Sequence, residues 1–281
     1  MEKTMSTELV IPPRPDILIK IQALIKSGDL ELSTLSNIIK KDVSLFSILM
    51  SAVNSPWLGL SQRVDNVETA VSLLGQLKIV NLLQAVIVRS CFKSSPLQVK
   101  FWDTATEVAS ISDNLAEQCG ISNAENAYTT GMLHNIGIAV MHSNFSEFDS
   151  FMDTSSHQSI DRLCVMQRQT FDTDHFLQGA LLAQSWYMPT QVTQAIRYQP
   201  IAQSILTGQK DIGTEPSNLL AVLILAKNIS NSYRHYWNIQ EDKFQLKSME
   251  AALDYLNIKK NEFKEHKEDI IEDLIAENKT E

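Results

Sequence analysis

A histidine beside a carboxamide, with a glycine on either side, is the stretch of this chain that could do chemistry. Residues 131–137 read Gly-Met-Leu-His-Asn-Ile-Gly. An imidazole nitrogen can ligate a divalent metal ion, and a metal-bound water is a nucleophile near neutral pH. An aspartate at position 135 would add a charged oxygen ligand, whereas Asn135 offers only a neutral carbonyl oxygen. His134 and Asn135 alone are therefore a weak signal for a metal site, and a hydrogen-bonded core histidine is the competing interpretation.

The composition is typical of a soluble globular protein. Of 281 residues, 44% are hydrophobic and 20% are charged. The formal net charge of −9 argues against a protein that binds the phosphates of nucleic acids. Cys91, Cys119 and Cys164 are far apart and form no CxxC pair, which indicates reduced thiols. We expect a cytoplasmic protein without a membrane segment, because no signal core and no bilayer-length apolar run is present.

Helical periodicity runs through the whole chain. Apolar residues recur at helical spacing, and no stretch alternates with the period of a strand. The nine glycines and eight prolines are too few for a fold with many tight turns. We therefore predict an all-α protein, in which an N-terminal helical bundle packs on a second helical lobe. Ser94-Ser95-Pro96 is the clearest boundary, and the predicted units are residues 8–95, 96–235 and 236–281.

The second lobe should hold the His134 stretch. A long helix after Pro96 should end at Gly120, and the next helix should run into His134. Asp172 and Asp174 have the chemistry of helix caps. The region from 199 to 215 reads mostly as loop. Further helices are predicted within 138–142, 160–170, 174–186, 189–198, 218–233, 246–256 and 259–278.

Six short motifs occur in an order that resembles the HDOD family, the bacterial HD-related output domain. Each is unspecific alone, but the series covers nearly the whole chain. They are Ile11-Pro12-Pro13, Ala52-Val53-Asn54-Ser55 with Gly59, Ala70-Val71-Ser72-Leu73-Leu74-Gly75, Phe101-Trp102, residues 131–137, and Asp174-His175 with Gly179, Trp186, Pro189 and Ala195-Ile196. The resemblance implies a fold like that of HD phosphohydrolases, in a family of signalling proteins that are generally not assigned enzymatic activity.

The resemblance also lets the metal ligands of HD enzymes be placed on this chain. Those enzymes use a histidine, a His-Asp pair and a later aspartate. The first position falls on Thr104, with Asp103 beside it, and the pair falls on His134 and Asn135. The later aspartate falls on Lys227, which in its protonated form cannot ligate a metal. His175 is a further candidate ligand, although a hydrogen-bonded helix histidine is the favoured interpretation.

We therefore expect a dismantled pocket that holds neither a metal nor a cofactor. The Lys227 ammonium should take the place of the metal and donate to nearby acceptors. The expected acceptors are the Asn135 carbonyl oxygen, a His134 nitrogen and Asp103. A lysine that points outward at the helix surface is the alternative.

The functional prediction is a non-enzymatic regulatory module that binds a protein partner or a small ligand. Trp57 could lie near the seam between the lobes or simply anchor a loop. A metal-dependent phosphohydrolase acting on nucleotides or phosphoesters is the first alternative, and a nucleic-acid-binding regulator is the second. No GxSxG elbow and no glycine-rich phosphate loop supports another kind of catalysis.

Overall fold

The computed structural model describes most of the second half of the chain and parts of the first half. The described residues are 15–28, 31–41, 63–75, 96–121, 125–155, 158–230, 243–265, 267 and 268, with single residues within 46–54 and 78–92. Every regular element among them is helical and none is a strand, so the all-α prediction is confirmed. None of the described helices is both long and apolar enough to cross a membrane.

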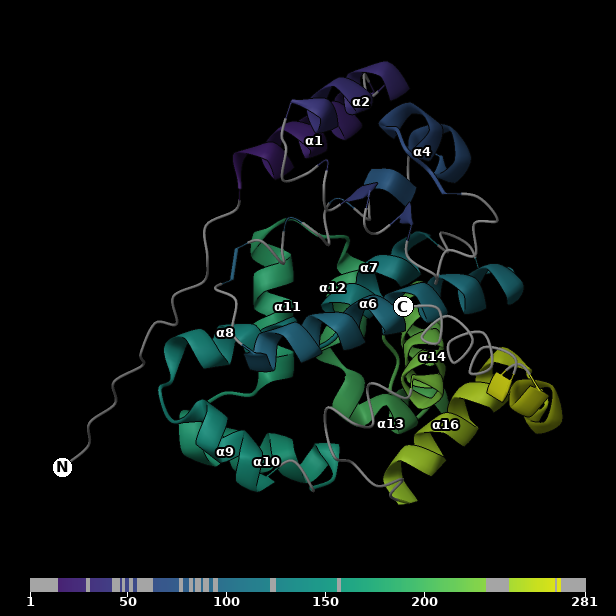
Figure 1. Ribbon diagram of the computed structural model, residues 1–281. Helices are drawn as coiled ribbons and strands as arrows, with labels where there is room; N and C mark the ends of the chain where they lie inside the picture. Colours follow the sequence, from purple (N-terminus) through teal and green to yellow (C-terminus); the bar gives the residue numbers. More distant parts are fainter. Residues whose placement is uncertain are drawn as a thin grey trace.

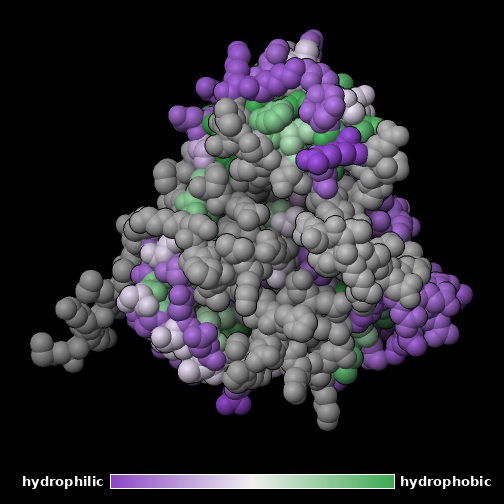
Figure 2. All heavy atoms as spheres, viewed as in Figure 1, coloured by the Kyte–Doolittle hydropathy of each residue, from purple (hydrophilic) through white to green (hydrophobic). Residues whose placement is uncertain are grey.

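Short amphipathic helices form the N-terminal lobe at the top of Figure 1. They bury apolar side chains such as Ile21, Leu35 and Val67 completely. Asn66 caps the helix that begins at Val67, because its side chain accepts a hydrogen bond from the Thr69 amide at 2.8 Å. On the face drawn in Figure 2, hydrophilic residues dominate this lobe, with hydrophobic atoms visible between them. The labelled helices are α1 (Asp16–Ser27), α2 (Leu32–Lys40) and α4 (Val67–Leu74).

A larger helical lobe lies below these helices in Figure 1 and carries the His134 stretch. Its long helix α6 packs against α7 and α14, and α11 packs against α8 and α12. Its elements are α6 (Pro96–Gln118), α7 (Glu125–Leu133), α8 (Ile136–Asn144), α9 (Phe148–Ser155), α10 (Ile160–Phe171), α11 (His175–Ser185), α12 (Thr190–Arg197), the 3-10 turn η2 (Gln199–Ile201), α13 (Ala202–Leu206), α14 (Thr214–Ile229) and α16 (Lys243–Leu256).

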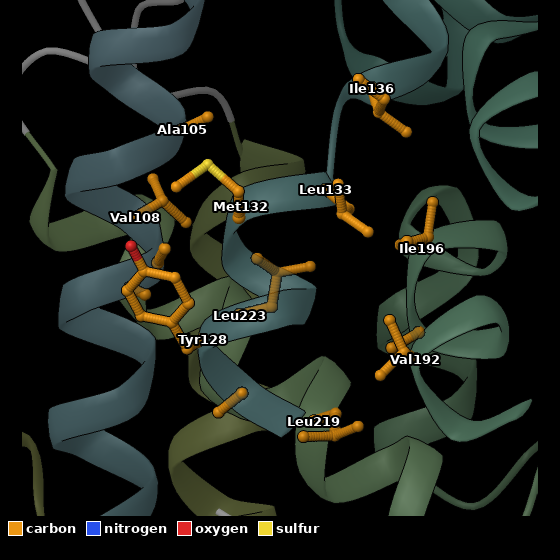
Figure 3. Close-up of a cluster of buried hydrophobic side chains, with 14 of the residues drawn as sticks. Ala105, Val108, Tyr128, Met132, Leu133, Ile136, Val192, Ile196, Leu219 and Leu223 are labelled. Carbon is orange, nitrogen blue, oxygen red and sulfur yellow. The ribbon is translucent and has the colours of Figure 1, made fainter. Parts of the chain in front are cut away.

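The core of this lobe lies where α6, α7, α12 and α14 meet. Figure 3 shows side chains from these four helices pointing toward one another. Val108, Val192, Ile196 and Leu223 are fully buried. The α7 helix lies in the middle of this core, so the turn that follows it begins deep inside the lobe.

The structure differs from the sequence prediction in two places. The predicted loop from 199 to 215 instead begins with η2 and α13, which carry the chain across the lobe. Helix α9 is absent from the prediction because its sequence is polar, and Phe148 and Phe151 hold it through contacts with Phe171 of α10. The predicted helix from 259 is helical at 260–265, 267 and 268, and its remainder lies outside the described residues, as does Trp57. The predicted division into three units remains a prediction.

Two glycines allow helices to touch backbone to backbone on either side of His134. A Cβ atom added at Gly131 would lie 2.5 Å from the Cα atom of Ala109 in α6. One added at Gly137 would lie 1.7 Å from the carbonyl oxygen of His175 in α11. No side chain fits at these distances, so α7 lies directly on α6 and α8 lies directly on α11.

Polar contacts also tie the two lobes together. The Gln22 side chain in α1 donates a hydrogen bond to the Trp186 carbonyl at the end of α11, at 2.8 Å. Lys78 lies 2.5 Å from Asp113 and 3.1 Å from Glu117, both in α6. Burial would lower the pKa of Lys78, but its bonds to these two carboxylates outweigh burial and raise it.

Replacing Gly137 by alanine should destabilise the fold severely. The new methyl group would overlap the His175 carbonyl, and backbone atoms cannot rotate away, so we expect a loss of about 3 kcal/mol or more in the free energy of unfolding. Urea unfolding measures this loss. The matched control is Gly179→Ala in α11, where the nearest atom to the new Cβ is 3.1 Å away. We expect that variant to lose far less, since alanine also favours the helix by about 1 kcal/mol. Equal losses in the two variants would contradict this account of the contact.

Candidate functional site

His134 lies in the turn between α7 and α8 and is 1% exposed. Its Nδ1 atom is 2.5 Å from the Gly131 carbonyl oxygen. Because a carbonyl oxygen can only accept, Nδ1 carries the hydrogen and Nε2 carries the lone pair. Burial lowers the pKa of His134 well below its usual value, and repulsion from the Lys227 ammonium lowers it further. The imidazole is therefore neutral at physiological pH.

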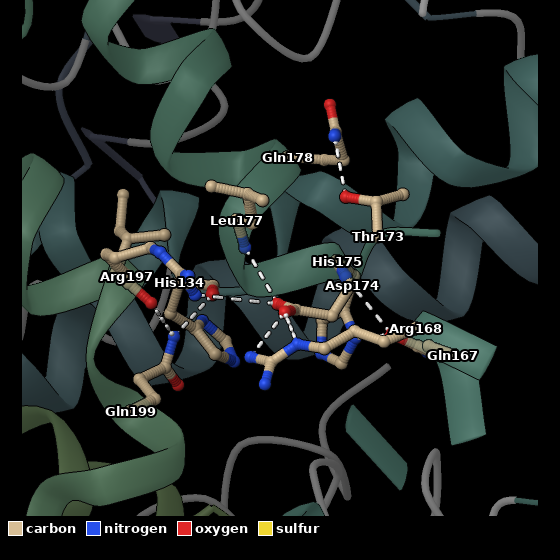
Figure 4. Close-up of polar contacts among 11 residues, drawn as sticks. His134, Gln167, Arg168, Thr173, Asp174, His175, Leu177, Gln178, Arg197 and Gln199 are labelled. Carbon is tan, nitrogen blue, oxygen red and sulfur yellow. Dashed lines mark hydrogen bonds and ion pairs between the residues drawn. The ribbon is translucent and has the colours of Figure 1, made fainter. Parts of the chain in front are cut away.

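The Gln199 side chain connects His134 to Lys227. Its Nε2 donates to the His134 carbonyl oxygen at 2.6 Å, and its Oε1 accepts from the Lys227 Nζ at 2.8 Å. Figure 4 shows Gln199 beside His134. The Gln199 amide also donates to the Ile196 carbonyl at 3.2 Å, which fixes the Gln199 side chain against the last turn of α12. Gln199 is 1% exposed and Lys227 is 5% exposed, so this bridge of hydrogen bonds lies inside the protein.

Lys227 points inward, as the family resemblance predicts, and its described acceptor is Gln199, which was not among the predicted ones. The side-chain oxygen Oδ1 of Asn135 is buried and, among the described residues, accepts no hydrogen bond. Asn135 begins α8 with φ −119° and ψ 17°, and its side chain makes no cap bond. The expected contact with Asn135 is therefore wrong, because Gln199 in η2 supplies the oxygen instead. Burial lowers the pKa of Lys227 to about 7, and Cys164 acts weakly in the opposite direction.

The two candidates on α6 are only partly described. Thr104 is 4% exposed and lies in α6, which packs against both α7 and α14. Asp103 precedes it in the same helix, but its side chain lies outside the described residues. Its predicted contact with Lys227 therefore stays a prediction.

His175 is held by a second buried glutamine. Gln167 Oε1 accepts from both the backbone amide of His175, at 3.0 Å, and its Nδ1, at 2.8 Å. The hydrogen is therefore on Nδ1 and the lone pair on Nε2, as in His134. Burial lowers the pKa of His175 to about 3, because Asp174 compensates only in part. This outcome agrees with the favoured interpretation of His175 as a hydrogen-bonded helix histidine.

Asp174 caps α11 as predicted and lies between two arginines. Its Oδ1 accepts from the Leu177 amide at 2.9 Å, which is a helix N-cap bond. Its Oδ2 is 2.7 Å from Arg168, and Arg197 is 3.8 Å from Oδ1 (Figure 4). The carboxylate is completely buried, so these partners and the helix end balance its charge. The ion pairs of Asp174 with Arg168 and Arg197 are therefore explained by their role in the fold.

The glutamines are the site residues that the sequence prediction did not include. The resemblance to metal-dependent HD enzymes implies partner histidines near the end of the helix that follows Pro189, where this chain has Tyr198-Gln199-Pro200, and that departure was the available signal. Gln167 stands in the middle of α10, where the sequence offers no comparable signal. Gln199 acts through contacts 65 and 28 residues along the chain, and Gln167 acts on His175 in the next helix, and periodicity reveals neither kind of contact.

Comparison with known proteins supports the resemblance. A family model described as the HDOD domain matches residues 11–201. An uncharacterized protein of Treponema pallidum (strain Nichols) is 30% identical over 191 residues, which cover 67% of this chain and 37% of that protein. This chain therefore matches little more than a third of that relative's length.

Solved structures share the fold at low sequence identity. A candidate signal transduction protein from Marinobacter aquaeolei VT8 is 22% identical with a TM-score of 0.70, over 98% of this chain and 61% of that one. An HDOD domain protein with unknown function from Geobacter sulfurreducens is 18% identical with a TM-score of 0.63, over 87% and 84%. A candidate phosphohydrolase from Shewanella amazonensis SB2B is 23% identical with a TM-score of 0.60, over 87% and 94%. At these identities the likeness shows the fold alone.

The donor set does not fit the metal ion that HD enzymes hold. His134 is a neutral imidazole of suitable tautomer, but a hydroxyl, an amide and an ammonium stand at Thr104, Asn135 and Lys227. A divalent cation at such a site needs anionic oxygens, and the ammonium would repel it. Among the side chains that the structure describes, no group of three or more His, Cys, Asp or Glu residues is placed to hold a metal.

Replacing Lys227 by methionine should flatten the dependence of stability on pH between about pH 7 and 8.5. The unfolded lysine keeps its proton there, whereas the folded lysine, with a pKa of about 7, loses it. The unfolded state then binds more protons, so parent stability rises with pH by at most about 1.4 kcal/mol per pH unit. In the folded protein the neighbouring His134 and His175 stay neutral in this window, and the Cys164 thiol, with a pKa of about 12, stays protonated. Because an unfolded thiol ionises at about pH 8.5, Cys164 opposes the rise toward the upper end of the window equally in the parent and in Lys227→Met, so the difference between the two slopes reports on Lys227.

Urea unfolding at several pH values measures this slope. Lys247→Met removes an exposed lysine of α16 and serves as the matched control, which should keep the parent slope. A parent whose stability does not rise over this window, or a Lys227→Met variant with the same rise, would contradict the assignment of a perturbed pKa to Lys227.

Proposed function

The chain belongs to the HDOD family, and we propose that it is a non-enzymatic regulatory module of a bacterial signalling pathway. It would act by binding a protein partner or a small ligand. The observation that carries the proposal is the buried Lys227 ammonium, hydrogen-bonded to Gln199 at 2.8 Å, at the position where HD enzymes carry a carboxylate ligand. In its protonated form, which is populated at and below its pKa of about 7, Lys227 places a positive charge of the protein itself where the reaction would need a metal.

The electrostatics of the pocket support this proposal. A metal-activated water requires a cation held by ligands that neutralise its charge. Here one protein cation is already buried, and a divalent ion beside it would meet uncompensated repulsion in a medium of low dielectric constant. The Lys227 ammonium can only donate hydrogen bonds, and the neutral side-chain oxygen of Gln199 accepts one of them. The pocket therefore has the chemistry of a hydrogen-bonded core.

The rival function, a metal-dependent phosphohydrolase, has one feature in its favour. His134 and His175 both carry their lone pair on Nε2 and donate through Nδ1, which is the state that a metal-ligating histidine adopts. The rival still needs anionic ligands at two further positions, where Asn135 and Lys227 stand. Direct assays of hydrolysis separate the two functions.

Purified protein should show no metal-dependent hydrolysis of phosphomonoesters, phosphodiesters or nucleotides. The physical reason is the loss of both carboxylate ligands, which leaves no site to activate water. The measurement is a substrate panel with added Mn²⁺ or Mg²⁺, with elemental analysis of protein purified without chelator. Turnover that Mn²⁺ stimulates and that His134→Ala abolishes would establish the rival function instead.

Restoring the ligands should create a metal site. The variant that combines Thr104→His, Asn135→Asp and Lys227→Asp should bind Mn²⁺, because it replaces an ammonium and two neutral groups by one imidazole and two carboxylates. Isothermal titration calorimetry measures the affinity, and added Mn²⁺ should raise the melting temperature of the variant alone. The matched control keeps Lys227 and carries only the other two changes. If that control binds Mn²⁺ as tightly as the full variant, the ammonium is not what excludes the metal.

A further inference from the structure

Two arginine side chains converge on the single carboxylate of Asp174. Arg168 of α10 donates from Nε to Oδ2 at 2.7 Å, and its Nη2 atom is 2.7 Å from the same oxygen. Arg197, the last residue of α12, places Nη1 3.8 Å from Oδ1. Figure 4 shows the two guanidinium groups reaching Asp174 from different helices. One carboxylate balances only one of the two positive charges, so the arginine pair keeps an excess positive charge.

Both guanidinium groups can meet a ligand from solvent. The Arg168 side chain is 50% exposed and that of Arg197 is 31% exposed, whereas Asp174 is completely buried. Each guanidinium has five N–H donors, and one carboxylate cannot accept from all of them. Two further acidic residues of this region, Asp161 and Asp172, are exposed, and in the described part of the chain neither forms an ion pair with the arginines. Donors of both arginines therefore remain available to an anion.

The hydrogen bonding of Asp174 does not account for Arg197. The carboxylate already accepts from the Leu177 amide at 2.9 Å and from Arg168. Arg197, at 3.8 Å, is beyond hydrogen-bond length, so it adds charge balance but no hydrogen bond to the fold. The end of α12 favours a basic residue there, but it would favour a lysine equally. The planar fork of an arginine is the group that matches phosphate oxygens.

The fold holds the two arginines in a fixed relation. Asp174 is anchored at the start of α11 by its cap bond, and it orients the Arg168 fork through two contacts. Helix α10 also packs against η2, which begins two residues after Arg197. An anion would therefore meet donors that are already in place, which lowers the entropic cost of binding it.

The arginine pair is close to the buried pocket. Burial and Asp174 raise the pKa of the Cys164 thiol to about 12, and the charges of Arg168 and Arg197 oppose that rise. Cys164 in turn acts on the pKa of Lys227. The thiol is therefore a common neighbour of the arginine pair and of the pocket lysine. A negative charge held by the arginines would favour the Lys227 ammonium, so such a ligand would act on the pocket without entering it.

We propose that Arg168 and Arg197 together bind a phosphate group of a small phosphorylated molecule. A phosphate offers several oxygens to the two forks and carries more negative charge than a carboxylate. Two arginines on a chain with a net charge of −9 are too few to hold the backbone of a nucleic acid, so the ligand is a small molecule. This inference rests on the proposed function, because it assigns a chemical class to the small ligand of the regulatory module.

Isothermal titration calorimetry at constant ionic strength tests the proposal with inorganic phosphate, pyrophosphate and ADP as probes. At least one of them should bind the parent with a millimolar or lower Kd, and acetate should bind more weakly. Arg197→Gln should weaken binding by about tenfold or more, because it removes a charged donor, and Arg197→Lys should lie between. The melting temperature of Arg197→Gln should stay near that of the parent, since Arg197 makes no hydrogen bond to Asp174.

The matched control is Arg162→Gln, which removes an exposed arginine from a different face of α10 and should bind like the parent. The proposal is overturned if none of the three probes binds, if acetate binds as tightly as phosphate, or if Arg197→Gln and Arg162→Gln lose affinity equally. Chromatography of the ADP after titration tests the proposed function separately. Intact ADP agrees with a non-enzymatic module, whereas hydrolysed ADP would refute that function and leave the phosphate site standing.

Discussion

The hydrogen bond between the Lys227 ammonium and the Gln199 carbonyl oxygen is the interaction on which the pocket depends. A buried cation is costly unless an acceptor compensates for its lost hydration. Gln199 supplies that acceptor at 2.8 Å and at its other end donates to His134 at 2.6 Å. The orientation of the amide is fixed from both sides, because a flipped amide would place an NH₂ group against an ammonium and an oxygen against a carbonyl. Burial keeps His134 neutral by lowering its pKa, and repulsion from the same ammonium adds to this effect.

The position of His134 is set by backbone contacts before any side chain takes part. Gly131 brings α7 against α6, and Gly137 brings α8 against α11, so the turn between them is held from both sides. The His134 carbonyl oxygen is thereby held in place to accept the hydrogen bond from the Gln199 side-chain amide. Because backbone atoms at such contacts cannot repack around a methyl group, the geometry of the pocket and the stability of the lobe rest on the same two glycines.

The sequence predicted what depends on local pattern and missed what depends on distant contacts. Periodicity predicted the helices, the family resemblance predicted the inward direction of Lys227, and cap chemistry predicted the role of Asp174. The region of Gln199 was predicted as loop, because a 3-10 turn and a five-residue helix are too short to show periodicity. The predicted acceptors of Lys227 were instead the candidates in the motifs, namely Asn135, a His134 nitrogen and Asp103. Side-chain direction in a turn follows its dihedral angles and packing, which no local pattern encodes.

The pocket and the surface of α11 differ in what they offer to another molecule. His134 and Gln199 are 1% exposed, so a ligand could reach Lys227 only by replacing the Gln199 oxygen and opening the core. The outward face of α11 requires no such opening. The helix begins at His175 and ends at Ser185, two residues before the exposed Tyr187, so it extends from the pocket to the exposed turn. Because α8 touches α11 backbone to backbone at Gly137, α11 cannot shift along its axis without moving the turn that carries His134.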